Sequence, residues 1–310
     1  MKPDRIVIVD WSASATPSPA RPSADAIWIG VADVADGALT SSYQRTRTDA
    51  FATLQSLTQQ ALFQGHRLLI GADFPFAYPT GFAAALSGVP RALSVWDWLA
   101  QHIEDATDNR NNRFQLADSI NARLPGIGPF WGRPAHLELP NLPDKGTARH
   151  GHGYPERRMV ETLVPAAQSC WKLYTTGSVG SQALLGIPVL ARLRTAFAGN
   201  VAVWPFEPWH DAPVVLAEVY PSLLSNQVRT LSGPAPATKF GWPIKDALQV
   251  RLLAGALAQM VREHSFAPLL TPAAPPQILS EEGWILGVGH EAELRSAAAS
   301  TGYAALPPKP

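Results

Sequence analysis

The sequence predicts an α/β fold in which helices flank one mixed sheet. Runs of β-branched and aliphatic residues at 6–10, 26–34 and 68–73 are typical of strands, and the alternation at 41–49 predicts one more. Residues 49–64 carry apolar side chains at intervals of three to five, which indicates a helix. This order predicts an antiparallel meander of three strands, followed by a helix and by a parallel strand beside the first.

The remaining elements follow from the same patterns. Helices are predicted at 94–105, 110–124, 179–197 and 244–264, with the third interrupted at Pro188, and strands at 201–207 and 214–221. The stretch from 124 to 155 is rich in proline and glycine with aromatic residues between them, so we expect an ordered loop there. We therefore predict a single domain over residues 1–310, with a helical and loop insert at about 105–200.

Composition narrows the class of protein. The chain has 310 residues, 46% of them hydrophobic, and its 25 basic and 25 acidic side chains cancel at a pI near 7.1. A protein that binds duplex nucleic acid by charge alone normally has a clear positive excess, so this balance counts against that class. The lone Cys170 excludes an internal disulfide, and we expect it to pack beside Trp171 rather than act as a nucleophile. With no apolar run of about 18 residues, we expect a cytoplasmic protein without membrane contact.

Four carboxylates stand at or beside the ends of predicted elements. Asp10 closes the first strand, Asp73 closes the strand before Pro75, Glu218 lies in the strand 214–221, and Asp246 opens the last long helix. A carboxylate at the end of a buried apolar strand is costly unless it is paired or binds a cation. If these strands are neighbours, the carboxylates meet at one edge of the sheet and supply the oxygen ligands that Mg²⁺ or Mn²⁺ requires. We therefore expect all four to be catalytic residues and metal ligands.

Each of these carboxylates also has an ordinary structural explanation. Asp10 and Asp73 could cap the turns that follow their strands. Glu218 could be an outward-facing residue of an edge strand, because side chains alternate between the two faces. Asp246 in the first turn of a helix is favoured by the helix dipole. The sequence leaves these alternatives open.

A second group of residues suggests a substrate clamp. Arg157, Glu161 and Lys172 lie near a turn that runs from Gly177 to Gly180. We expect the basic side chains and the turn's amides to bind phosphate, with Glu161 orienting Arg157 four residues away on a helix. Ser12 after the first strand and Lys245 before Asp246 are further candidate substrate-binding residues. The alternative is a solvated helix face with an ordinary loop.

Two other motifs carry less weight. The turn at Gly177–Gly180 lacks the G-x-x-x-x-G-K-[ST] pattern of a P-loop, and no G-x-G-x-x-G follows a strand. His150 and His152 lie in a loop without a third ligand at the spacing typical of zinc sites.

With these residues in view, the chain resembles a domain-of-unknown-function family of predicted RNase H-like nucleases. The similar segments, in chain order, are IVIVDWSAS, IGADFPFAYPTGF, GSVGSQALLGIPVLARLR, AEVYPSLL, KDALQVRLLAGALA and EEGWILGV. They span residues 5 to 288. The resemblance implies an RNase H-like fold and assigns Asp10, Asp73, Glu218 and Asp246 to its acidic site.

We expect a divalent-metal-dependent phosphodiester hydrolase that acts on a phosphate-containing substrate, either nucleic acid or nucleotide. Two alternatives remain open: a nucleotide- or cofactor-processing enzyme of the phosphotransferase kind on the same fold, and a non-catalytic binding module. The sequence does not predict an oligomeric state. The first function requires the four carboxyl groups to converge, at least one carboxylate pKa to be raised in the absence of metal, and the clamp to lie across the mouth of the acidic site.

Overall fold

A computed structural model describes residues 1–232 and 244–301 of the chain. The chain divides into two compact units. The sheet unit comprises Met1–Asp73, Phe197–Pro272 and the chain from Ile285 onward, and the insert unit comprises Phe74–Ala196 and Ala273–Trp284. The predicted insert at about 105–200 falls mostly in the second unit, which starts earlier, at Phe74, and gains a segment from near the C-terminus.

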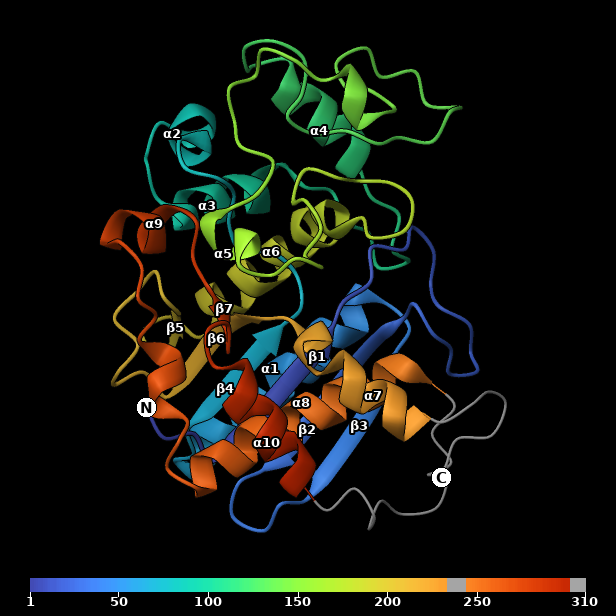
Figure 1. The fold of residues 1–310 in the computed structure, drawn as a ribbon. Coiled ribbons are helices and arrows are strands. Elements are labelled where there is room, and N and C mark those ends of the chain that lie inside the picture. The colour runs from blue at the N-terminus through green and yellow to red at the C-terminus, as the bar shows by residue number, and fades with distance from the viewer. Residues whose placement is uncertain (233–243, 302–310) are drawn as a thin grey trace. The chain divides into compact units, whose positions relative to one another are not determined.

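The sheet unit is built on one seven-stranded mixed sheet of order β3-β2-β1-β4-β6-β5, with β7 also pairing with β6 (Figure 1). The strands are β1 (Arg5–Asp10), β2 (Ile27–Asp33), β3 (Leu39–Gln44), β4 (Leu68–Ala72), β5 (Val201–Val203), β6 (Val214–Val219) and β7 (Ile285–Leu286). β1, β2 and β3 are antiparallel, whereas β4, β5, β6 and β7 pair in parallel. This confirms the predicted fold class, with β1 beside β4 inside the sheet and a strand order consistent with an RNase H-like core.

The helices of the sheet unit are α1 (Arg47–Gln64), α7 (Ser225–Ser232), α8 (Lys245–Arg262) and α10 (Glu291–Ser300), together with short 3₁₀ turns at Pro221–Leu224 and Ala267–Leu270. α1 begins at a capping box, in which Thr46 and Asp49 exchange side-chain and backbone hydrogen bonds, and it ends at Gly65 in the left-handed conformation. α8 lies over β1, β2 and β3, and α10 packs on α8 (Figure 1).

One glycine sets the distance between α8 and the sheet. A Cβ atom on Gly30 of β2 would lie 2.7 Å from the backbone carbon of Val250 in α8, which is closer than real contacts allow. The helix backbone therefore rests directly on the strand. Because Gly30 pairs with Ile8 in β1, this contact also fixes α8 over the strand that ends at Asp10.

The insert unit is mainly helices and ordered loops. Its helices are α2 (Phe82–Ser87), α3 (Ala92–His102), α4 (Arg113–Asn121), α5 (Met159–Thr162), α6 (Val179–Ala196) and α9 (Pro276–Glu281), with a 3₁₀ turn at Gly146–Ala148. Its core is aromatic: Trp171 lies 5.0–5.1 Å, centroid to centroid, from Tyr78, Phe82 and Phe130. The predicted interruption of α6 at Pro188 is wrong. The helix continues through this proline, whose neighbours Ile187 and Val189 are fully buried, so packing outweighs the lost backbone hydrogen bond.

No helix in the described part of the chain is both long enough and apolar enough to cross a bilayer.

Candidate acidic site

Asp10 and Asp73 lie side by side because their strands are neighbours that run in the same direction. Asp10 is the last residue of β1, and Asp73 follows the last residue of β4. The parallel register pairs Val9 with Ala72, and the backbone N–H of Asp73 donates to the carbonyl of Val9 at 3.2 Å. The carboxyl ends of parallel strands meet at one edge of a sheet, so both side chains emerge there.

The third carboxylate comes from α8. Asp246 lies one helical turn before Val250, so both project from the same face of the helix. Val250 rests on Gly30, which pairs with Ile8, two residues before Asp10. From this contact, Asp246 lies one helical turn away, about 5.4 Å, and Asp10 lies two strand residues away, about 6.6 Å. These similar distances bring Asp246 level with Asp10. The glycine contact thus brings the helix start to the strand end.

A short hydrogen-bonded loop holds this arrangement together. The backbone N–H of Trp11 donates to Asp73 Oδ1 at 2.7 Å, and the backbone N–H of Asp25 donates to Asp246 Oδ2 at 2.8 Å. The carboxyl groups of Asp10 and Asp73 lie close enough that each changes the pKa of the other.

The electrostatics of the three aspartates differ from those of ordinary surface carboxylates. Burial, followed by the charges of Asp73 and Asp246, raises the pKa of Asp10 well above its usual value. Burial raises the pKa of Asp73 to about 7, against hydrogen bonds from Trp11 and Asp10 that lower it. Burial also raises the pKa of Asp246. The prediction that at least one carboxylate pKa is raised is therefore confirmed. We refer to Asp10, Asp73 and Asp246 as the acidic triad.

Glu218 is separated from the triad by the register of the sheet. It pairs with Ala72 of β4, which in turn pairs with Val9 of β1. Side chains at one level of a parallel sheet share a face, and the next residue uses the other face. Glu218 therefore belongs to the row of Val9 and Ala72, whereas Asp10 belongs to the following row. It is 3% exposed, and its role as a metal ligand remains a prediction.

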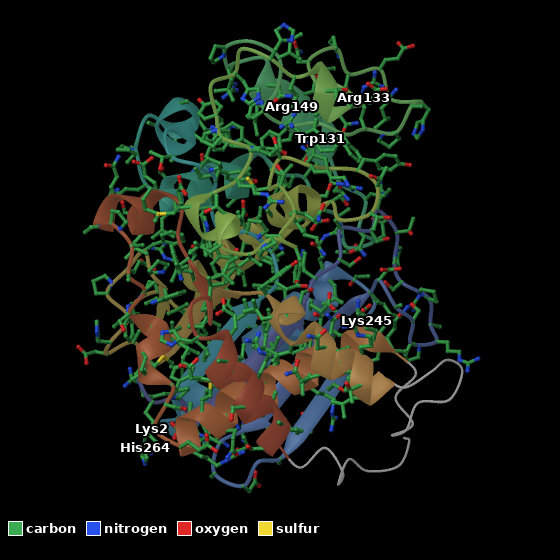
Figure 2. All side chains as sticks on the ribbon, viewed as in Figure 1. Lys2, Trp131, Arg133, Arg149, Lys245 and His264 are labelled. Atoms are coloured by element: carbon green, nitrogen blue, oxygen red, sulfur yellow. The ribbon has the colours of Figure 1, made fainter. Side chains whose placement is uncertain are left out.

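The two predicted substrate-binding residues of the sheet unit have different surroundings. The hydroxyl of Ser12 donates to the carbonyl of Asp25 at 2.8 Å, which connects the loop after β1 to the residue that holds Asp246. Lys245 is exposed at the first position of α8, as Figure 2 shows, and its charge lowers the pKa values of Asp10 and Asp246. Ser12 thus has a structural task, while Lys245 supplies a cation next to the triad.

Sequence reasoning missed two residues of this site. Asp25 has a left-handed backbone with φ of 58°, and its charge raises the pKa of Asp246. The buried Arg47, at the start of α1, donates to the backbone carbonyls of Ser12 and Ser14 at 3.2 and 2.8 Å. An arginine immediately after the Thr46 helix cap is ordinary in sequence, so only the folded loop reveals its task. Asp25 gave a weak signal, because aspartate tolerates the left-handed conformation better than most residues.

The predicted clamp residues lie in the insert unit, and the structure corrects two of their roles. Glu161 does not pair with Arg157. It forms a buried ion pair at 2.8 Å with Arg158, three residues before it. The backbone N–H of Gly180 donates to the carbonyl of Lys172 at 3.0 Å, so it is engaged and does not face a phosphate. Gly177 adopts a left-handed conformation with φ of 77°. The expected position of the clamp across the acidic site stays a prediction.

The acidic triad has the right chemistry for a hard cation but no completed coordination shell. Its donors are carboxylate oxygens only, which suits Mg²⁺ or Mn²⁺. Burial, and after it the neighbouring negative charges, raise the pKa values of the triad, so a cation that binds there would displace protons. Within residues 1–232 and 244–301, no group of three or more His, Cys, Asp or Glu side chains is already arranged to hold a metal ion. The residues therefore fit such a cation by donor type, and ligation requires the carboxylates to turn toward it.

Comparisons of the chain with protein-family models, with curated proteins and with solved structures found no match.

Proposed function

We propose that this protein is a divalent-metal-dependent phosphodiester hydrolase whose reaction takes place at the acidic triad. The observation that carries the proposal is the convergence of three aspartates from β1, β4 and α8, in surroundings that raise the pKa of each. A raised pKa at a cluster of like charges is costly for the folded protein and is typical of functional sites. The RNase H-like strand order agrees with this function, although a fold alone does not decide it.

Asp10, Asp73 and Asp246 would hold Mg²⁺ or Mn²⁺ in their deprotonated forms. Such a cation lowers the pKa of water and stabilises the charge of the leaving oxygen. Asp10 interacts with both other carboxylates of the triad and would be the residue through which the three act together on a bound cation. The backbone N–H groups of Trp11 and Asp25 keep Asp73 and Asp246 oriented. Lys245 would attract the anionic substrate to a site that otherwise repels it.

The test is metal titration followed by an activity screen. Calorimetry with Mg²⁺ or Mn²⁺ should show binding that releases protons near neutral pH, because the pKa of Asp73 is about 7. Hydrolysis should then be measured on single-stranded DNA, RNA, branched duplexes and bis(p-nitrophenyl) phosphate. Asp10→Asn and Asp73→Asn should abolish both binding and hydrolysis.

The matched control is Asp36→Asn. Asp36 is exposed in the β2–β3 turn and accepts a hydrogen bond from the backbone of Ala38, which asparagine can also accept. This variant should behave as the wild type. If the protein bound metal and transferred phosphate between nucleotides but did not cleave diesters, the phosphotransferase alternative would be favoured. Absence of metal binding would favour the non-catalytic one.

A further inference from the structure

The insert unit carries a row of alternating cationic and aromatic side chains, which we call the aromatic–cation strip. Its members are Arg113, Phe114, Trp131, Arg149, Lys172 and Tyr174. Arg113 lies 4.3 Å above the ring of Phe114, which meets the ring of Tyr174 edge-on at 6.2 Å. Arg149 and Lys172 lie 5.3 and 5.7 Å from the ring of Trp131. Figure 2 shows Trp131 and Arg149 together among the loops beside α4.

Backbone pairing joins the two halves of the strip. Trp131 and Lys172 form a parallel bridge, and the N–H of Leu173 donates to the carbonyl of Trp131 at 2.9 Å. Along this extended segment burial alternates strictly: Trp171 and Leu173 are buried, Lys172 is partly exposed, and Tyr174 is 43% exposed. Side chains two residues apart in an extended chain project to the same side. Lys172 and Tyr174 therefore face outward together.

Two cations of the strip, Arg149 and Lys172, retain hydrogen-bonding capacity. Arg149 donates through Nε to Gly146, through Nη1 to Pro129 and through Nη2 to Glu156, which uses three of the five guanidinium N–H groups. Within the described part of the chain, Lys172 Nζ donates to the carbonyl of Thr176, which leaves two of its three N–H groups. The side chain of Arg149 is 11% exposed, so it supports the ring of Trp131, whereas Lys172 remains available to an anion.

Trp131 is the ring that the two cations share. Its indole Nε1 is buried and has no acceptor among the described residues, as is also true of Trp284 in the same unit. Its contribution to the strip is therefore the ring face that lies near Arg149 and Lys172.

The net charge around the strip is close to balanced. Residues 101–180, which include every member of the strip, contain nine Lys and Arg against eight Asp and Glu, a net charge of +1. An anionic partner is therefore favoured by the partly exposed Lys172 beside an aromatic ring and not by net charge.

We propose that the aromatic–cation strip binds single-stranded nucleic acid. The open ring of Tyr174 stacks on an unpaired base, and Lys172 and Arg113 contact phosphates on either side of it. An exposed ring beside a cation is the combination that single-strand binders use, because every base has a stacking face. This inference deepens the proposed hydrolase function and rests on it for its biological meaning.

The experiment measures fluorescence anisotropy of a labelled 12-nucleotide single strand, as oligo-dT and as oligo-U, with the full chain in EDTA so that nothing is hydrolysed. Binding should weaken as KCl rises. Tyr174→Ala should weaken it by roughly 5- to 100-fold, and Lys172→Gln should reduce its salt dependence. Tyr174→Phe keeps the ring and should bind as the wild type.

Matched controls come from the sheet unit. Phe63→Ala removes an aromatic ring that is 93% exposed, and Lys2→Gln removes an exposed lysine (Figure 2). Both should leave binding unchanged. Loss of binding in Tyr174→Phe at an unchanged melting temperature would overturn the stacking role. Equal affinity for a 12-base-pair duplex, or full competition by a mononucleotide at equal phosphate concentration, would overturn the proposal in favour of simple anion binding.

The failure of this inference can be told apart from the failure of the hydrolase proposal. Asp10→Asn should still bind the single strand while losing hydrolysis of bis(p-nitrophenyl) phosphate. Tyr174→Ala should lose the single strand while keeping that hydrolysis. A wild-type chain that hydrolyses the small diester but does not bind the oligonucleotide contradicts the strip alone. A chain that binds the oligonucleotide but no metal contradicts the hydrolase alone.

Discussion

Both units place carboxylates in poorly solvated positions, but only one unit neutralises them. In the insert unit, Glu161 pairs with Arg158 at 2.8 Å, and both side chains are at most 2% exposed. Glu282 accepts the backbone N–H groups of Thr80 and Met159, at 2.8 and 2.6 Å. In the sheet unit, the three aspartates of the acidic triad face one another, and the nearby cation, Lys245, is exposed.

This difference separates structural acids from functional ones. A buried carboxylate that accepts hydrogen bonds from a guanidinium and from amides has its charge compensated inside the protein. In a cluster of carboxylates with raised pKa values, the negative charges are not balanced by neighbouring groups of the protein. Such a cluster is stabilised when it binds a cation or a proton. We therefore regard the Arg158 network as a tie within the insert unit, and the triad as a site that a ligand completes.

The largest expected effect is on the Arg158 network. Arg158→Ala would leave Glu161 buried without its cation and would remove a bond to the carbonyl of Glu282. Breaking a buried pair by removing one partner costs about 3–5 kcal/mol in the free energy of unfolding. Urea denaturation measures this loss. The neighbouring Arg157→Ala, which removes a partly exposed arginine, is the matched control and should change stability by less than about 0.5 kcal/mol. If Arg158→Ala and Arg157→Ala lowered the free energy of unfolding equally, the Arg158–Glu161 pair would not be a structural tie of the insert unit.

The second prediction concerns the contact that positions α8. Gly30→Ala would force the backbone at Val250 away from β2, at a cost of roughly 1–3 kcal/mol in unfolding free energy. Because Asp246 lies one turn from Val250, we also expect weaker Mn²⁺ binding, measured by calorimetry. Gly65→Ala is the control. An added Cβ there meets no neighbour, but the left-handed backbone of Gly65 makes the substitution destabilising. This variant should therefore lose stability without a change in metal binding. Unchanged metal binding in Gly30→Ala would show that α8 does not set the site geometry.

The third prediction is a gain in stability. Folded Asp73 holds its proton up to about pH 7, whereas an unfolded aspartate releases it near pH 4. The folded state therefore binds more protons in this window, and the free energy of unfolding contributed by Asp73 falls as the pH rises from about 4 to 7. Asp73→Asn keeps the acceptor for Trp11 and removes the charge, so it should raise stability at pH 8 by roughly 1 kcal/mol, or about 2–4 °C in Tm. A Tm lower than that of the wild type at pH 8 would contradict the conclusion that burial makes the charged form of Asp73 unfavourable.

The smallest effect is expected at Lys245. Its positive charge lowers the pKa values of Asp10 and Asp246, so Lys245→Gln should raise both. Metal binding in this variant should require a slightly higher pH than in the wild type, and the change should be small because an exposed charge is screened by solvent and salt. Calorimetric titrations at several pH values measure this shift, with Lys2→Gln as the control. A shift in the opposite direction would place Lys245 outside the field of the triad.

Much of the sheet unit could be predicted from local sequence. The apolar runs that became β1, β2 and β4 and the periodicity that became α1 and α8 depend on neighbours a few residues away, which is why their order and type were predictable. Asp10 and Asp73 were predictable for the same reason, since a carboxylate that closes a buried strand is visible in the chain itself. The insert unit was harder, because its loops are held by long-range bonds such as those of Arg158 with Glu282, more than one hundred residues apart.

The sequence by itself determined the alternation of elements, and with it the mixed sheet and the position of two aspartates at strand ends. Only the tertiary structure decided which carboxylates meet. The register of β6 against β4 places Glu218 level with Ala72 and Val9, one residue before the row of Asp10 and Asp73. The close approach of Val250 to Gly30 brought Asp246 to Asp10, and the folded loop supplied Asp25. Periodicity is a local property of the chain, whereas register and helix-to-sheet distance depend on contacts between segments that the sequence separates by more than two hundred residues.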